Sequence, residues 1–267
     1  MYIRLPQYDS VDYDDTFASS NDSVPSEFLS EAVFAGDCFW GLEAALGLLD
    51  GVVKTVTGYF GGTFPKPNHK EVCEGTTCHT EAVKVYFDKR KVSYKSLCDT
   101  FWDTHDPTNK EYLNFGISTH YRSVIYYGSE EERKEAMESK IRRQMKLNKR
   151  IVTKIIRVDG DFYVAENCHQ KYYLQKKWRI CESLGLRSSE QLVESNISCK
   201  LNGILAMEGL ELVHRLTKFV ETQELPKQTK LACKEIIHSI SKDQRESKES
   251  TFWEDHMLNG HPNGAGI

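Results

Sequence analysis

Hydrophobic and polar residues alternate in several short stretches of the chain, and elsewhere hydrophobic residues recur at the spacing of a helix. The alternating, β-branched or wholly apolar stretches predict strands over 32–36, 52–59, 80–87, 121–127 and 151–158. The helical spacing predicts helices over 39–49, 92–105, 129–150 and 164–176. Elements that follow one another in this order indicate a sheet covered by helices, of α+β or α/β type.

The pattern changes towards the C-terminus. Leu192, Leu201 and Leu212 belong to a long series at helical spacing, so 187–240 is predicted to be a helical extension of a folded domain at 31–186. The first 30 residues are rich in Asp and Ser and carry few aliphatic side chains, so a disordered acidic tail is expected over 1–30. The polar end, 241–267, is expected to be a flexible tail.

The composition limits the classes of protein to which the chain can belong. Its 267 residues carry 35 Lys and Arg against 39 Asp and Glu, a net charge of −4, which argues against a nucleic-acid partner. The basic residues between 140 and 150 end a predicted helix whose start is acidic, which suits the helix dipole. The sequence has no apolar run long enough for a membrane span, so no membrane partner is expected.

The N-terminal segment bears on the compartment. It has no basic stretch followed by an apolar run, and its acidity is unlike that of a transit peptide. A cytoplasmic protein is therefore expected, with access to the nucleus left open. In a reducing compartment the eight cysteines are expected to be free, catalytic or metal-bound rather than joined in structural disulfides.

The stretch with the most chemical information surrounds Cys38. A predicted strand runs into Gly36, so Cys38 falls in the first turn of the next helix, where unpaired amide groups and the helix dipole stabilise a thiolate. Phe39 and Trp40 follow directly and offer an apolar surface beside the sulfur. Such a thiol suits a substrate with a small apolar group next to an electrophilic atom. A buried cysteine that packs as a small hydrophobe explains the same stretch equally well.

Short motifs of one enzyme family recur in order and register between residues 31 and 181. They are 36–41 (GDCFWG), 58–62 (GYFGG), 65–73 (PKPNHKEVC), 75–83 (GTTCHTEAV), 101–108 (FWDTHDPT), 119–127 (THYRSVIYY) and 162–173 (FYVAENCHQKYY). In these motifs the chain resembles the peptide methionine sulfoxide reductases of the A type, which act on the S epimer. The resemblance implies an α+β fold, with a mixed β-sheet and helices packed on it as a ferredoxin-like two-layer sandwich. It also implies thiol-dependent reduction of methionine-S-sulfoxide, both free and within oxidised proteins.

The resemblance assigns roles to individual residues. Cys38 matches the nucleophile that attacks the sulfoxide sulfur and becomes a sulfenic acid. Glu81 matches the acid, kept neutral by desolvation, that gives the sulfoxide oxygen its proton. Tyr121 matches a tyrosine that donates a hydrogen bond to the same oxygen. Phe39 and Trp40 match the walls that hold the substrate methyl group.

Recycling of the sulfenic acid is assigned to a C-terminal cysteine. Cys181 lies twelve residues after His169, where the family often places its first recycling cysteine, although the usual glycine-rich flanks are absent. Cys199 is a second candidate, but it lies in a helical pattern where a core position is the more common role. Thioredoxin or a dithiol would reduce the resulting intramolecular disulfide, so the resemblance implies an external reductant, no bound cofactor and a monomer.

Three positions depart from the family pattern. Asp37 stands in place of a glycine, where its carboxylate either raises the pKa of Cys38 or caps the helix. His69 stands in place of a tyrosine that helps to hold the sulfoxide oxygen, and we expect its ring to approach that oxygen. Gly116 stands in place of an aspartate.

Two other classes of function stay open. Phe39 and Trp40 would also serve a non-catalytic module that binds methionine or its sulfoxide. Cysteine and histidine are zinc ligands, and a zinc site would draw on Cys73, Cys78, His79, Cys168 and His169. The spacing of these residues is not that of a common zinc finger, so the reductase without a metal is favoured.

Overall fold

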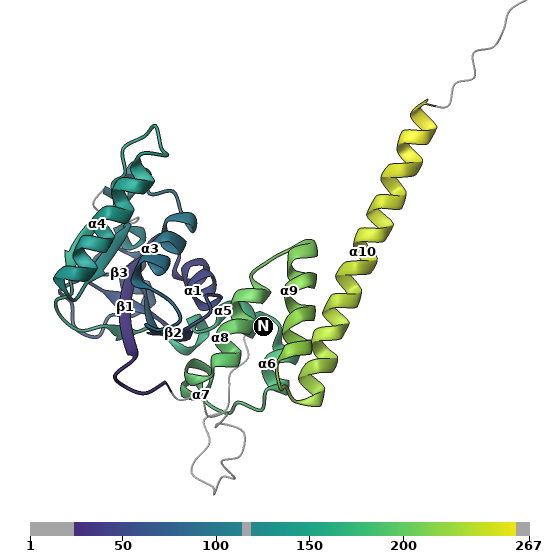
Figure 1. The fold of residues 1–267 in the computed structure, drawn as a ribbon, viewed down its shortest axis with the longest axis horizontal. Helices are drawn as coiled ribbons and strands as arrows, with labels where there is room; N and C mark the ends of the chain where they lie inside the picture. The colour runs from purple at the N-terminus through teal and green to yellow at the C-terminus, as the bar shows by residue number, and fades with distance from the viewer. Residues whose placement is uncertain (1–23, 114–118, 260–267) are drawn as a thin grey trace, which may run out of the picture.

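The computed structural model describes the backbone of residues 24–113 and 119–259, and the side chains of 24–111 and 119–243 (Figure 1). Most of the predicted acidic tail lies outside the described residues, as do Gly116 and residues 260–267. The sequence-based expectations for these positions therefore stay predictions.

A six-stranded sheet forms the centre of the N-terminal part. Its strands are β1 (Leu29–Ala35), β2 (Val52–Phe60), β3 (Thr80–Asp88), β4 (Val124–Tyr127), β5 (Lys154–Arg157) and β6 (Tyr163–Val164). They lie in the order β5-β4-β1-β3-β2-β6, and all neighbours are antiparallel except the parallel pair β4 and β5. This arrangement confirms the predicted α+β fold with a mixed sheet.

Side chains of β1 alternate between two packed faces of the sheet, as the period of a strand requires. Phe34 is fully buried in the main core together with side chains of α1 (Phe39–Gly47) and α3 (Tyr94–Asp103). Val33 and Ala35 face the other side and pack with Phe60. The helix α4 (Glu130–Gln144) contacts α3, where the Trp102 indole N–H donates to Ser139 Oγ at 3.0 Å. The main core therefore holds β1 firmly just before Cys38.

The helix predicted over 164–176 is correct only for its second half. The structure has β6, a short 3-10 helix η3 (Asn167–His169) and then α5 (Tyr172–Lys176). The Gln170 side chain is buried and bonds to the backbone N–H and C=O of Thr57 and the C=O of Ala165, which fastens this segment to β2. Lys171 has a φ of 49°, a left-handed conformation that a continuous helix does not allow.

A short helix that the sequence analysis does not predict, α2 (His69–Cys73), lies between β2 and β3. Its N-terminus is a capping box: the Asn68 side chain accepts from the Glu71 N–H, and the Glu71 carboxylate accepts from the Asn68 N–H, both at 3.1 Å. The Asn-x-x-Glu spacing is the sequence signal that predicts this helix start.

The C-terminal part is a group of helices, as predicted for 187–240. It contains α6 (Trp178–Ser183), α7 (Ser189–Glu194), α8 (Asn196–Leu205), α9 (Gly209–Thr222) and α10 (Lys227–Asn259). The helices α9 and α10 lie side by side (Figure 1). The backbone of α10 is helical as far as Asn259, so secondary structure continues into the segment predicted to be a flexible tail. Strong helix formers and the lack of Gly or Pro before Gly260 explain this continuation.

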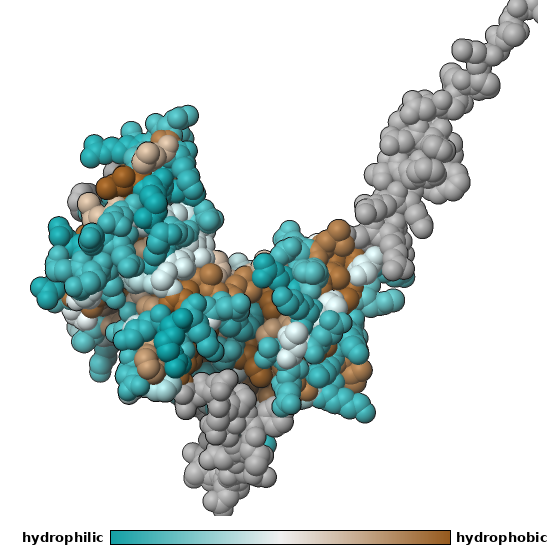
Figure 2. All heavy atoms as spheres, viewed as in Figure 1, coloured by the Kyte–Doolittle hydropathy of each residue, from teal (hydrophilic) through white to brown (hydrophobic). Residues whose placement is uncertain are grey.

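The helices of the C-terminal part have their own hydrophobic core, which includes Leu192, Leu212 and Leu216. On the face seen in Figure 2, hydrophobic side chains gather where these helices meet the sheet. The helix α8 packs closely on α1, because a Cβ atom on Gly203 would lie only 2.6 Å from the Ala44 carbonyl oxygen. Cys199 of α8 is buried in the main core beside the sheet. The C-terminal part is therefore packed against the helix that starts at Cys38. Among the helices of the described residues, none combines the length and apolarity that crossing a membrane requires.

Candidate active site

The turn between β1 and α1 places Cys38 at the N-cap of α1, where the sequence predicts it. Asp37, just before it, has a φ of 56°, in the left-handed region that Asp tolerates better than most residues and that glycine adopts freely. The Asp37 carboxylate accepts from the Cys38 N–H at 2.8 Å, and the Asp37 N–H donates to the Tyr121 carbonyl oxygen at 3.2 Å. Asp37 therefore braces the turn, whereas the N-cap residue itself, Cys38, makes no side-chain cap.

The environment of Cys38 raises the pKa of its thiol to about 12. Burial is the main cause, followed by the carboxyl group of Glu81; Asp37 adds to the rise. A hydrogen bond from the Trp40 N–H at the helix start acts in the opposite direction but is outweighed. The helix amides therefore act on the thiolate in the expected direction, but desolvation and nearby carboxyl groups exceed their effect and the resting thiol is protonated.

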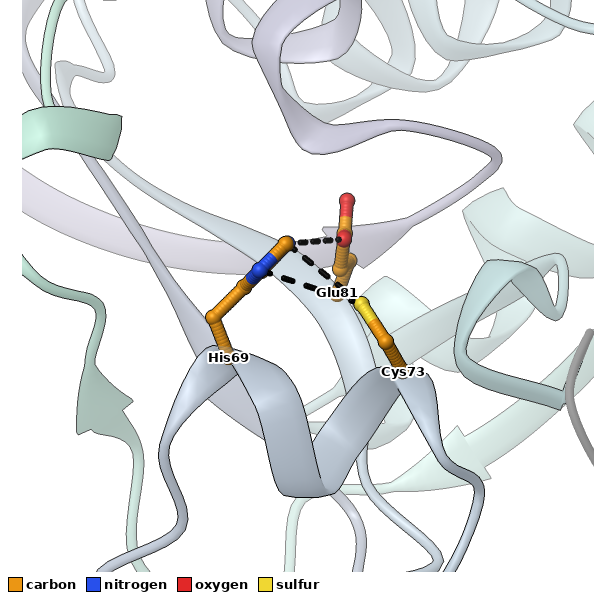
Figure 3. A group of neighbouring side chains, drawn as sticks. All are labelled: His69, Cys73 and Glu81. Carbon is orange, nitrogen blue, oxygen red and sulfur yellow. Dashed lines mark hydrogen bonds and ion pairs between the residues drawn. The ribbon is translucent and has the colours of Figure 1, made fainter.

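Glu81 lies on β3 and is only 1% exposed, as its place on an apolar strand suggests. Its Oε2 accepts a hydrogen bond from the Phe39 N–H at 3.1 Å, so the carboxyl group is fixed beside the residue that follows Cys38. Its Oε1 lies 3.3 Å from Nε2 of His69, and the ring of His69 points at the carboxyl group (Figure 3). The structure thus brings together His69, Glu81 and the start of α1.

Aromatic rings form a wall next to Cys38. Phe39 is fully buried, and its ring centroid lies 5.4 Å from that of His169 and 6.3 Å from that of His69. Trp40 is half-buried and stacks on Tyr172 with ring centroids 3.7 Å apart and an interplanar angle of 2°. This apolar surface is of the kind that holds a methyl group. Tyr172, which fixes the plane of Trp40, is a residue that the sequence analysis quotes in a motif without giving it a role.

Glu166 is another residue to which the sequence analysis gives no role. Its carboxylate accepts from the Tyr59 hydroxyl at 2.6 Å and from the His69 N–H at 2.8 Å, and so ties α2 to β2. Burial alone would raise the pKa of Glu166. The two hydrogen bonds lower it by more than burial raises it, so the pKa lies below its usual value. The hydrogen bond to Glu81 raises the pKa of His69.

Tyr121 ends the 3-10 helix η2 (Thr119–Tyr121) and is half-buried. Burial raises the pKa of Tyr121, and the nearby carboxyl group of Glu81 raises it further. Its hydroxyl group therefore stays protonated and is available as a hydrogen-bond donor across the physiological pH range. The 3-10 helix η2 contacts β3, the strand that carries Glu81.

The two cysteines proposed for recycling are both buried, and Cys181 belongs to a different core from the one against which Cys38 packs. Cys181 is buried in the C-terminal core, and burial raises its pKa to about 11. Cys199 is buried beside Thr55, with its Sγ 3.5 Å from the threonine hydroxyl. Cys168, in contrast, is exposed and directly precedes His169, whose ring packs near Phe39. A bond between Cys38 and Cys181 requires α6 to open.

The zinc ligand set considered from the sequence is not assembled. Nδ1 of His79 accepts from the Gly62 N–H at 3.1 Å, and Nε2 lies 2.8 Å from the Phe64 carbonyl oxygen, so both ring nitrogens already have partners. Cys78 is exposed. His79 has a structural role, since its ring supports the turn after β2.

Comparisons with known proteins agree with this fold and place it in a family. A family model described as peptide methionine sulfoxide reductase matches residues 30–201. The peptide methionine sulfoxide reductase MsrA of Methanosarcina acetivorans is 46% identical over 154 residues, which are 57% of this chain and 81% of the relative. The chloroplastic peptide methionine sulfoxide reductase A4 of Arabidopsis thaliana is 43% identical over 171 residues, 64% of each chain.

A solved structure gives the same result. The reduced form of Mxr1 from Saccharomyces cerevisiae superposes with a TM-score of 0.52 at 30% identity, over 56% of this chain and 87% of that one. The fold and the family match define an oxidoreductase of α+β architecture. The chain belongs to the peptide methionine sulfoxide reductase family, in its A type, and carries additional C-terminal helices.

Proposed function

We propose that the chain reduces methionine-S-sulfoxide, in oxidised proteins and as the free amino acid, with Cys38 as the nucleophile. The observation that carries this proposal is the hydrogen bond from the Phe39 N–H to Glu81, which fixes a buried carboxyl group next to Cys38 at the N-cap of α1. Family membership supports the reaction type, and the aromatic wall of Phe39 and Trp40 supports a substrate with a methyl group on sulfur.

The proposed reaction transfers one oxygen atom. The Cys38 sulfur attacks the sulfoxide sulfur, and Glu81 gives a proton to the sulfoxide oxygen as negative charge develops there. The Tyr121 hydroxyl group donates to the same oxygen, and His69 supports the carboxyl group from 3.3 Å. The oxygen then moves to the Cys38 sulfur: a bond between oxygen and Cys38 forms, and the bonds from the substrate sulfur to oxygen and to Cys38 break. Methionine leaves, Cys38 is left as a sulfenic acid, and the proton lost by the Cys38 thiol restores Glu81.

The raised pKa of Cys38 explains why the carboxyl group is needed. The resting thiol is protonated, so attack on the sulfoxide must be coupled to loss of the thiol proton. The substrate oxygen takes up a proton in the same step, and a buried acid between donor and acceptor lowers the cost of both transfers. This coupling also keeps the cysteine unreactive in the absence of substrate.

Recycling is the second half of the proposal. Cys181 attacks the Cys38 sulfenic acid, water leaves, and the disulfide is reduced by thioredoxin or a dithiol. The burial of Cys181 means that α6 opens before this step, so disulfide formation is slower than the first release of methionine. A monomer in the reducing cytoplasm completes the proposal, since the recycling reaction uses cysteines of one chain.

The test is reduction of each methionine sulfoxide epimer by the purified protein with dithiothreitol. Wild type should convert the S epimer and leave the R epimer, whereas Cys38→Ser should show no turnover with any reductant, because a hydroxyl group is a far poorer nucleophile at neutral pH. The exposed Cys78→Ser variant is the matched control and should keep full activity. Substantial activity of Cys38→Ser would refute the assignment of the nucleophile.

A further inference from the structure

His69, Cys73 and Glu81 form a cluster of three different metal-ligating side chains (Figure 3). His69 and Cys73 are four residues apart on α2, so both point from the same face of this helix, and Glu81 faces them from β3. One ligand atom of each residue lies within 4.8 Å of the other two. Within the described residues, this is the one group of three His, Cys, Asp or Glu side chains whose ligand atoms lie this close together.

Two of the three distances between ligand atoms fit a tetrahedral zinc ion, and the third lies within 4.8 Å. Zinc bonds of about 2.0–2.1 Å to nitrogen, 2.0–2.2 Å to oxygen and 2.3 Å to sulfur place two ligand atoms about 3.4 Å apart for nitrogen and oxygen, and about 3.5 Å for nitrogen and sulfur. In the structure, Nε2 of His69 lies 3.3 Å from Oε1 of Glu81 and 3.5 Å from Sγ of Cys73. Sγ also lies 3.8 Å from Nδ1, so the sulfur is close to both ring nitrogens and the imidazole ring must rotate before Nε2 faces an ion shared with Sγ.

The surroundings hold these ligands in place. The Phe39 N–H binds Oε2 of Glu81 and leaves Oε1 to face His69, and the Glu166 carboxylate holds the backbone of His69. Such outer partners orient ligands and strengthen metal binding. The His69 side chain is 35% exposed and Cys73 is half-buried, so an ion can enter from solvent. Glu81 is buried behind them.

We propose that His69, Cys73 and Glu81 bind a zinc-like divalent cation, with the fourth position taken by water, and that the bound ion inhibits the enzyme. A nitrogen, a sulfur and an oxygen ligand favour a borderline-soft ion over magnesium or calcium. Inhibition follows because the ion binds the Glu81 carboxylate, which then cannot carry the proton that the substrate oxygen needs. The binding stands on the geometry alone, whereas the inhibition rests on the proposed function.

The binding experiment uses Co²⁺ as a spectroscopic substitute for zinc on the reduced full-length protein. One equivalent should give the absorption of a tetrahedral thiolate–cobalt complex, and excess Zn²⁺ should remove it. Cys73→Ser should abolish the thiolate-to-cobalt absorption, and His69→Tyr should weaken binding more than about tenfold, since even outer-shell partners contribute about 10–100-fold. Cys78→Ser is the matched control and should bind like wild type. An absorption that is absent in wild type, or unchanged in Cys73→Ser, would overturn the site.

The inhibition experiment measures the release of one methionine by the reduced enzyme without added thiol, since thiols sequester zinc. For wild type and for Cys73→Ser, the rate of methionine release with one equivalent of Zn²⁺ is divided by the rate without it, and the two ratios are compared. Wild type should be inhibited more than about tenfold and Cys73→Ser much less, in proportion to its weaker binding. Equal inhibition of both would place the inhibitory ion elsewhere. A wild type that binds Co²⁺ but shows no turnover even without metal would refute the proposed function and leave the metal site standing.

Discussion

The ammonium group of Lys171 lies 2.6 Å from Oε1 of Glu43, and neither side chain is exposed to solvent. Lys171 also donates to the Thr55 carbonyl oxygen at 2.6 Å, while the Glu43 carboxylate accepts from the Thr55 hydroxyl group and the Lys171 N–H. Asn202 of α8 lies at the edge of this network, 3.4 Å from Glu43. The network joins α1, which begins at Cys38, to β2 and to the C-terminal helices.

Breaking this ion pair should destabilise the protein strongly. Lys171→Met leaves the Glu43 charge buried without its cation, so the free energy of unfolding should fall by about 3–5 kcal/mol. The matched control is Lys95→Met, which removes an exposed ion pair with Asp99 and should cost about 0–1 kcal/mol. Urea unfolding of both variants measures the difference. Equal, small losses would mean that the buried pair does not hold α1.

The carboxyl group of Glu81 should be essential for rate rather than for structure. Glu81→Gln keeps an oxygen to accept from the Phe39 N–H but cannot deliver a proton, so single-turnover release of methionine should slow by about 10²–10⁴-fold. Glu74→Gln changes an exposed carboxylate after α2 and should leave the rate unchanged. A Glu81→Gln variant with the wild-type rate would remove Glu81 from the mechanism.

The pKa of Cys38 predicts the pH dependence of its reactivity. Because the pKa is raised to about 12, the reactive thiolate is scarce at neutral pH, and alkylation of Cys38 should accelerate up to pH 10 without levelling. An ordinary thiol levels off above about pH 8.5. Asp37→Asn removes one of the charges that raise the pKa and also tolerates the left-handed turn, so alkylation should become faster at each pH.

Mass spectrometry of the peptide that contains Cys38 measures this alkylation with iodoacetamide. Asp50→Asn, an exposed position beyond the end of α1, is the control and should match wild type. A wild-type profile that levels near pH 8.5 would show that the burial of Cys38 does not set its reactivity.

Replacement of the recycling cysteine should separate the two halves of the reaction. Cys181→Ser should still release about one methionine per enzyme, because attack by Cys38 is unaffected, but should lose turnover driven by thioredoxin. In wild type, rapid-quench measurements should show release of the first methionine before the disulfide between Cys38 and Cys181 forms. The disulfide is delayed because α6 must open to free Cys181. Cys168→Ser is the informative comparison, because Cys168 is exposed near the site. Loss of turnover in Cys168→Ser alone would transfer the role to that residue.

The sequence alone predicts the strands β1 to β5, the helices α1, α3 and α4, and the position of Cys38. These features depend on local sequence: the apolar run around Phe34 and the Gly36 that follows it are visible in a short window. The motifs also predicted the family and pointed to Glu81, whose burial the structure reports. The break in the helix predicted over 164–176 was not visible in this way, because the side chain of Gln170 makes it by bonding to a distant strand.

Only the tertiary structure decided how the site behaves chemically. The pKa of Cys38 depends on burial and on carboxyl groups that other elements supply, and these outweigh the helix start that the sequence displays. The same holds for the cluster of His69, Cys73 and Glu81, in which one ligand comes from β3 and two come from α2. Local sequence specifies which elements form, whereas electrostatic fields and ligand geometry depend on distances of a few ångströms between elements that are far apart in the chain.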